Sequence, residues 1–212
     1  MSSDRDVSPV VKQKLEAARD TLETAEFGLA DLDSDDPRRR IAGFRNLVVF
    51  GRAVTNALQT LRTPLGPEFD AWYAGRQEEM RGDELMRYFY ILRSEILKEG
   101  RISSLAVRTI ISSFGPSDMA RLQKQAPPGA HGFFMGDRLG GDGWDVKLPD
   151  GSSEKYYISL PGDIQAQTTV HLADPPSSHL GEAVEDTTIK ALGKHYVEYL
   201  RGLLTEAEAR FT

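Results

Sequence analysis

Hydrophobic residues recur at intervals of three and four in four long stretches of the chain, at residues 9–30, 37–62, 83–99 and 184–210. Such spacing places apolar side chains on one face of an α-helix and polar side chains on the other. In the first stretch the apolar face consists of Val11, Leu15, Ala18, Leu22, Ala25 and Leu29. Because every stretch carries such a face, the pattern predicts four helices packed as one bundle.

Between the third and fourth stretches the pattern changes to that of β-strands. Residues 107–114, 132–135, 144–148, 155–160 and 168–172 are rich in β-branched and aromatic side chains and are separated by turn residues. Pro149-Asp150-Gly151 between two of these segments is typical of a β-hairpin. The sequence therefore predicts an α+β fold, in which a helical bundle at residues 1–104 and 180–212 carries a small antiparallel β-sheet at residues 105–179, inserted before the last helix.

Two short segments complete this outline. Thr63–Pro67 contains two prolines and a glycine, which interrupt helices, so the second helix should end there. Glu68–Tyr73 follows and predicts a helical turn whose aromatic rings cover one end of the bundle. Ser117–Leu122, between the predicted strands, indicates one further helical turn.

Composition narrows the class of protein. The 212 residues include no cysteine, which excludes disulfides, thiolate catalysis and cysteine-ligated zinc. The net charge of −6 argues against a generally basic surface for nucleic acid. No apolar run approaches the length of about 20 residues that a membrane span needs, and Met1–Asp6 lacks the features of a signal peptide. We expect a soluble cytoplasmic protein without a cofactor.

Metal binding is not favoured by any acidic or histidine cluster. Asp31-x-Asp33-x-Asp35 has the spacing of a calcium loop, but Asp36 replaces the glycine that such a loop needs. The simpler interpretation is a solvated turn that ends in an N-cap, with Pro37 opening the next helix. The four histidines form no ligand pair. The Gly140–Gly143 loop lacks the Lys-Ser/Thr ending of a phosphate-binding loop, so we expect a tight turn, with Asp137 and Asp142 as turn formers.

The second helical stretch contains no acid and presents a row of arginines. Arg38, Arg45 and Arg52 are spaced by seven residues and span about 21 Å along a helix. This row has two interpretations. It forms a surface that follows phosphates, or its arginines pair with the acidic first helix as an antiparallel neighbour.

The third helical stretch carries the strongest candidate motif. Asp83 is placed to cap its start and Gly100 to end it. Leu92-Arg93-Ser94-Glu95-Ile96-Leu97-Lys98 resembles the signature helix of HEPN-like domains, whose motif is an arginine, a small polar residue, three or more positions and then a histidine. Arg93 and Ser94 match the first two places, and Lys98 stands in place of the histidine.

The resemblance implies a HEPN-like four-helix bundle in which two protomers meet at their signature helices. In that family the arginine and histidine promote attack of an RNA 2′-hydroxyl on the adjacent phosphate without a metal. A lysine with an ordinary pKa of about 10.4 is protonated at neutral pH and cannot accept the proton. Arg93 and Lys98 would then be a degenerate catalytic pair.

Three functions remain open at this point. The first is a homodimer that binds RNA or another phosphate-bearing ligand at its interface without cleaving it, through Arg93, Ser94, Lys98, Arg45 and Arg52. The second is a non-enzymatic scaffold in which Arg93 is only structural. The third is an active, metal-independent ribonuclease that uses Lys98 or a histidine from elsewhere in the chain.

Overall fold

The computed structural model describes residues 8–100, 102 and 105–212, and its fold is mixed α and β. Met1–Asp6, from which we predicted the lack of a signal peptide, lie outside these residues. The helices are α1 (Pro9–Ala30), α2 (Pro37–Gln59), α3 (Arg62–Leu65), α4 (Pro67–Gly82), α5 (Glu84–Glu99), α6 (Pro116–Gln123) and α7 (Ile189–Phe211), and a short 3₁₀-helix, η1 (Asp31–Asp33), follows α1. None of the helices in the described residues is both long and apolar enough to pass through a bilayer.

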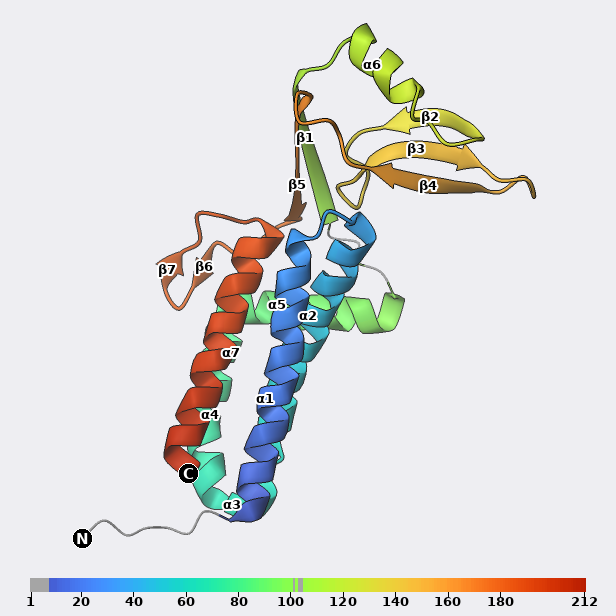
Figure 1. Cartoon of the computed structure of the whole chain (residues 1–212). Helices are drawn as coiled ribbons and strands as arrows, with labels where there is room; N and C mark the ends of the chain where they lie inside the picture. Colours follow the sequence, from blue (N-terminus) through green and yellow to red (C-terminus); the bar gives the residue numbers. More distant parts are fainter. Residues whose placement is uncertain (1–7, 101, 103–104) are drawn as a thin grey trace.

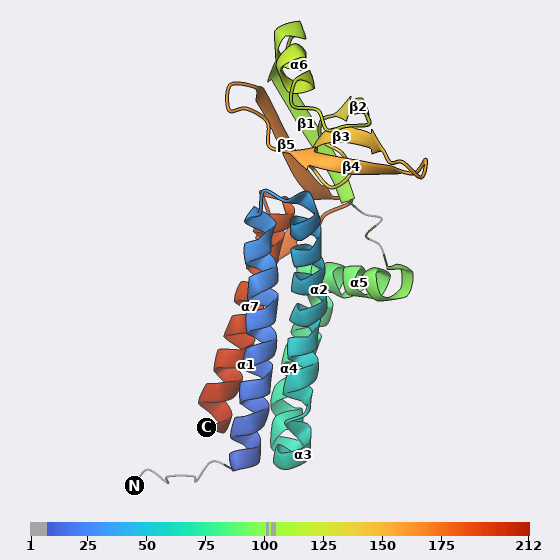
Figure 2. The same cartoon turned by 45° about the vertical axis from the view of Figure 1, so that its right-hand side comes forward.

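The helical part is arranged differently from the predicted bundle. All four predicted stretches are helical, but α5 lies across the others, while α1, α2, α4 and α7 run side by side (Figures 1 and 2). The predicted turn at Glu68–Tyr73 is therefore only the start of α4, which continues to Gly82. Beyond Tyr73 no α4 residue is fully buried, so the sequence carried no apolar stripe that would predict a long helix there.

One core joins the helices. Gly28 and Gly43 let α1 and α2 approach closely, because a Cβ on Gly28 would lie 2.6 Å from the carbonyl oxygen of Gly43. Deeper in the bundle, Phe89 of α5 stacks on Tyr196 of α7 with ring centroids 4.0 Å apart. At the end of the bundle near α3, the rings of Phe69, Trp72, Tyr73 and Phe211 pack together. This packing confirms that the aromatic residues of the 68–73 segment cover one end.

The inserted strands form two sheets in the described residues, so the prediction of one sheet is wrong. Strand β1 (Leu105–Ser113) pairs only with β5 (Gln165–Leu172) as an antiparallel ribbon that leaves the bundle (Figure 1). Strands β2 (Ala130–Phe134), β3 (Asp142–Lys147) and β4 (Ser153–Ile158) form the second sheet. Helix α6, longer than the predicted turn, covers this sheet with Leu122, and the two share a small core with Trp144 and Val146.

A short hairpin precedes the last helix. Strands β6 (Ser178–His179) and β7 (Glu182–Ala183) pair in antiparallel fashion, and β6 packs against α5. The predicted boundary at residue 179 therefore falls inside this hairpin. Helix α7 begins at Ile189, later than the predicted residue 184, because Thr188 caps it by accepting a hydrogen bond from the Ala191 N–H at 3.3 Å.

Candidate functional site

A cavity of about 540 Å³ lies where α2, α4, α5 and α7 meet. We call it the arginine–tyrosine cavity. Its lining consists of Arg52, Thr55, Tyr73, Gln77, Met80, Arg81, Met86, Arg87, Tyr90, Ile91 and Tyr196. All of these residues are described by the structure, and none of them is acidic. The crossing helix α5 contributes four of these residues, Met86, Arg87, Tyr90 and Ile91.

Arg52 is the half-buried cation of this cavity. Its guanidinium donates to the Thr55 hydroxyl and lies 5.9 Å from the centre of the Tyr90 ring. Within residues 8–100, 102 and 105–212, Arg52 has no ion pair with a carboxylate. A half-buried guanidinium in this state is poorly compensated, so an anion entering the cavity would be stabilised by it.

Two further arginines line the cavity and increase its positive charge. Arg81 lies 3.6 Å from Glu78, but both side chains are largely exposed, so this ion pair is weak. Arg87 is exposed and has no ion pair in the described part of the chain. The lining therefore carries three guanidinium groups and no carboxylate.

The tyrosines supply hydroxyl groups that stay protonated. Burial raises the pKa of Tyr73, against the opposing effect of the nearby Arg52 charge, and its hydroxyl donates to the Thr55 carbonyl oxygen at 3.5 Å. Burial also raises the pKa of Tyr196. Tyr196 can pack this close to α2 because Gly51 faces it: a Cβ there would lie 2.3 Å from the ring. At neutral pH both phenols keep their protons, so neither adds negative charge to the cavity.

The motif residues of α5 lie outside this cavity. Arg93 is half-buried and its guanidinium has no ion pair or hydrogen bond in the described residues, and Lys98 is exposed in the last turn of the helix. The Ser94 hydroxyl donates to the Tyr90 carbonyl oxygen at 3.1 Å, within its own helix. Of the five predicted ligand residues, the structure places only Arg52 in the cavity.

The row of arginines on α2 does not pair with the acidic first helix, so that interpretation is wrong. Arg38 donates to the Lys155 carbonyl oxygen at 3.3 Å, and Arg45 donates to the Gly100 carbonyl oxygen at 2.8 Å, which holds the end of α5 against α2. One acid of the first helix, Glu26, pairs instead with α7, where Arg201 lies 2.6 Å from it. Helical periodicity does not say which neighbouring element an exposed arginine reaches, so these partners could not be predicted.

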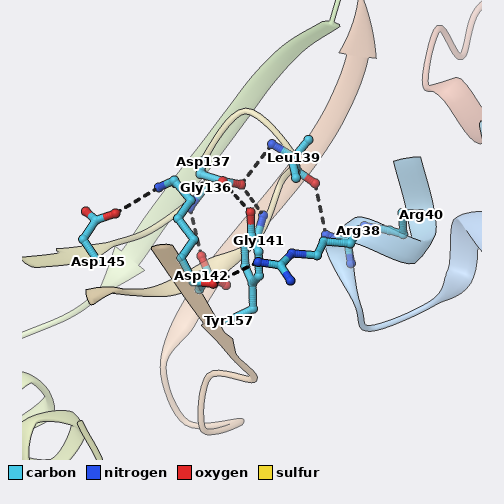
Figure 3. A network of polar contacts seen from close by, with 10 residues as sticks. Arg38, Arg40, Gly136, Asp137, Leu139, Gly141, Asp142, Asp145 and Tyr157 are labelled. Atoms are coloured by element: carbon cyan, nitrogen blue, oxygen red, sulfur yellow. Dashed lines mark hydrogen bonds and ion pairs between the residues drawn. The ribbon is translucent and has the colours of Figure 1, made fainter. Parts of the chain in front are cut away.

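Figure 3 shows how the N-terminal end of α2 supports the inserted loop. Arg40 donates to the Leu139 carbonyl oxygen at 3.4 Å. It also donates to the Gly140 carbonyl oxygen at 2.8 Å. Asp137 accepts from the Leu139 and Gly141 N–H groups, and Asp142 accepts from the Gly136 N–H at 2.9 Å. These bonds confirm that Asp137 and Asp142 are turn formers. Burial raises the pKa of Asp142, despite that hydrogen bond.

The Asp31–Asp36 segment also has the predicted structure. It forms η1 and a turn, and the Asp36 carboxylate caps α2 by accepting from the Arg38 N–H at 2.8 Å. Among the described residues, no cluster of three or more His, Asp or Glu side chains is arranged to hold a metal ion.

The sequence analysis missed most of the cavity. Tyr73, Arg81, Arg87, Tyr90 and Tyr196 were not predicted as site residues. Arg87, Tyr90 and Ile91 are spaced by three and four on a face of α5 other than its buried stripe, and this was the one available signal. No sequence signal identified Tyr196 as a site residue, because its place in the apolar stripe of the last helix is that of a core residue.

Comparison with known proteins gives one family. The model of the family described as bacteriophage lambda protein ea47 matches residues 15–130, which is more than half of the chain. The match spans α1 to α6 and ends at the first residue of β2. No curated protein and no solved structure matches this chain.

Proposed function

The chain belongs to the family of bacteriophage lambda protein ea47, and we propose that it binds a phosphate-bearing ligand, RNA or a nucleotide, in the arginine–tyrosine cavity. The observation that carries this proposal is the charge of the cavity, which has three arginines and no acid in its lining. Guanidinium groups bind phosphate oxygens in a bidentate way and remain charged at every physiological pH.

The apolar part of the lining favours a ligand with a planar ring as well as a phosphate. Tyr90 offers an aromatic face beside Arg52, and Met80, Met86 and Ile91 complete an apolar wall. Bases stack on aromatic side chains without regard to sequence, and the volume falls in the range of about 300–1,000 Å³ typical of small-molecule sites. A nucleotide, or the end of an RNA strand, combines both features.

The lining favours binding without cleavage. Its titratable groups are arginines and tyrosines, and the raised pKa values of Tyr73 and Tyr196 keep these phenols from acting as bases near neutral pH. On the Arg93-Ser94 motif we propose that the chain is HEPN-like and catalytically degenerate, with Lys98 in place of the histidine.

We also propose a homodimer through α5. Tyr90, Ile91 and Leu97 are 55%, 62% and 53% exposed, and with Ser94 they follow one face of this helix. α5 projects from the side of the bundle (Figure 2), where a second copy can reach it. Because Tyr90 and Ile91 also line the cavity, a second copy on this face would cover the bound ligand and bring Arg93 near the interface.

Calorimetric titration with adenosine monophosphate, inorganic phosphate and a short single-stranded RNA tests the binding proposal. We expect Arg52→Gln to weaken binding by at least about tenfold, because it removes a charged, bidentate donor. Lys12→Gln, an exposed change on α1, should leave binding unchanged. If the wild-type protein binds none of the three at millimolar concentration, the proposal is wrong and the scaffold alternative gains support. Cleavage of the RNA by the wild type would instead favour the ribonuclease.

Light scattering tests the dimer. We expect two copies at micromolar concentration for the wild type and a monomer for Ile91→Glu, because the introduced carboxylate would be buried opposite the partner. Arg93→Glu should weaken the dimer if Arg93 lies near the interface. A wild-type monomer would rule out the composite site while leaving the cavity itself to be tested by titration.

A further inference from the structure

A second cavity, of about 440 Å³, lies on another side of α4 and α7, beneath the β6–β7 hairpin. We call it the histidine–glutamate cavity. It shares no lining residue with the arginine–tyrosine cavity. The lining consists of Arg76, Glu79, His179, Leu180, His195, Glu198, Tyr199, Gly202, Leu203 and Glu206.

His179 is held in this cavity by a buried carboxylate. Its Nδ1 lies 3.1 Å from both oxygens of Asp83, and the two side chains are 11% and 4% exposed. Asp83 also accepts from the N–H groups of Met86 at 2.8 Å and Leu180 at 2.7 Å. Because the carboxylate accepts, Nδ1 carries a proton, and in the neutral tautomer with this proton Nε2 is a hydrogen-bond acceptor. His179 lines the cavity, whereas Asp83 does not.

The other donors of the cavity are already used within the protein. Arg76 donates to Glu79 at 3.0 Å and lies 3.1 Å from Glu206. The Tyr199 hydroxyl donates to Glu79 at 2.7 Å, and burial together with this bond raises the pKa of Tyr199, so the proton stays in place. A ligand therefore meets few free donors.

What remains free is acceptor capacity and negative charge. The lining carries three glutamates and one arginine, and a further cation, Lys194, lies 4.0 Å from Glu198 with both side chains exposed. His179 Nε2 accepts no hydrogen bond among the described residues. This polarity is the reverse of that in the arginine–tyrosine cavity.

The backbone at this cavity is in an uncommon conformation. Leu180 has a φ of +51°, in the left-handed region that side chains with a Cβ rarely adopt, and its side chain is exposed. The hydrogen bond from its N–H to Asp83 holds it there. Leu180 and Leu203 give the cavity apolar surface, and the Tyr199 and His195 rings lie 6.0 and 5.9 Å from the His179 ring. Strained residues persist at ligand sites because the surroundings hold them in place.

We propose that the histidine–glutamate cavity binds a primary alkylammonium group. The ammonium would donate to His179 Nε2 and to the Glu198 carboxylate, and the alkyl chain would lie along Leu180, Leu203 and the ring of Tyr199. A free polyamine and a lysine side chain of another protein share this chemistry. The inference is independent of the phosphate-binding proposal, because the two cavities have no residue in common.

Two-dimensional NMR of the histidine ring nitrogens of the ¹⁵N-labelled full chain tests this proposal. n-Butylammonium should shift the Nε2 signal of His179, whereas n-butyrate, with a similar chain and the opposite charge, should not at the same ionic strength. Spermidine represents a free polyamine, and a short peptide with one lysine represents the side chain of another protein. The probe that binds at the lower concentration identifies the source of the alkylammonium group.

Glu198→Gln provides the decisive variant because Glu198 is exposed and the change should not affect folding. We expect it to weaken n-butylammonium binding about fivefold, the effect of one partly exposed charge. Glu23→Gln, an exposed change on α1, should have no effect. The proposal is overturned if n-butyrate binds as well as n-butylammonium, if Glu198→Gln binds as the wild type does, or if the His179 signal does not respond at tens of millimolar amine.

Discussion

Gly51 determines how closely α2 approaches α7, and with it the shape of the arginine–tyrosine cavity. A Cβ at this position would lie 2.3 Å from Cε1 of Tyr196 and 3.2 Å from Cδ1 of Leu200. Tyr196 is buried and stacked on Phe89, so a methyl group at position 51 would have to displace a packed ring. Residues of this kind control a site without contacting its ligand.

Gly51→Ala should lower the free energy of unfolding by about 1–3 kcal/mol, the usual cost of adding a methyl group to a packed core. Gly75→Ala is the matched control. Gly75 lies inside α4 with no atom within 4 Å of the added Cβ, so alanine there should stabilise by about 0.4–1 kcal/mol. Urea unfolding of both variants measures the difference, and similar shifts for the two would contradict the packing argument.

Tyr157 makes stability depend on pH in alkaline solution. Burial and a 2.8 Å hydrogen bond to Asp137 raise the pKa of its phenol from 10.0 to about 12. Because the folded state binds this proton more tightly than the unfolded state, the stabilisation is complete below about pH 10 and is lost as the pH rises toward 12. Tyr157→Phe should therefore lose less stability than the wild type between about pH 9 and pH 12. Urea unfolding at several pH values measures the free energy of unfolding of both proteins. If the two values fall in parallel as the pH rises, the prediction is wrong.

At the scale of elements, α5 contributes to both cavities. It lines the arginine–tyrosine cavity, and its N-cap Asp83 holds His179 of the histidine–glutamate cavity. The helix is held at both ends. Arg45 holds its C-terminal end through the Gly100 carbonyl oxygen. At its N-terminal end, Asp83 binds His179 and Leu180, while the Glu84 carboxylate accepts three hydrogen bonds from Ser177 and Ser178. These bonds lower the pKa of Glu84, so the carboxylate is ionised at neutral pH.

Asp83→Ala should destabilise the protein by about 3 kcal/mol, because a buried carboxylate that accepts three hydrogen bonds is lost. Asp36→Ala removes the exposed cap of α2 and should cost about 1 kcal/mol. Hydrogen exchange should accelerate at residues 177–180 and in the first turn of α5 only in the Asp83 variant. Unchanged protection of the 177–180 segment would show that Asp83 acts as a helix cap alone.

The elements themselves were largely predictable, because their signals are local. Asp83 and Gly100 bound α5 as their residue types indicate, with the Met86 N–H on Asp83 and a φ of +66° at Gly100. Periodicity identifies the buried face of a helix but not the direction in which the helix runs, so the crossing of α5 could not be predicted. The partners of Arg38 and Arg45 are equally inaccessible, because they lie far away in sequence.

At the scale of the whole molecule, the described residues form two separate hydrophobic cores. The helical core and the core around Leu122, Trp144 and Val146 are separate clusters of buried side chains. The β1–β5 ribbon joins them, and Val107 lies opposite Val170 in its register. The chain therefore enters and leaves the insert at nearly the same place.

Replacing residues 108–169 with two glycines should leave the helical part folded, because Val107 and Val170 are already adjacent and the helical core loses no buried residue. Thermal unfolding followed by circular dichroism should remain cooperative, with a higher fraction of helix. A variant without a cooperative transition would show that the insert is needed for the bundle to fold.

The position of the insert also determines when the core can form during synthesis. The Phe89–Tyr196 stack and the hydrogen bond from Trp72 to Glu206, 134 residues apart, both need α7, which the ribosome makes only after the whole insert. Until then the parts of the apolar faces of α1, α2 and α5 that pack against α7 are exposed, and the nascent chain is open to aggregation. We expect ribosome-bound chains that end before Ile189 to bind chaperones that recognise exposed apolar segments, and to release them once α7 has emerged.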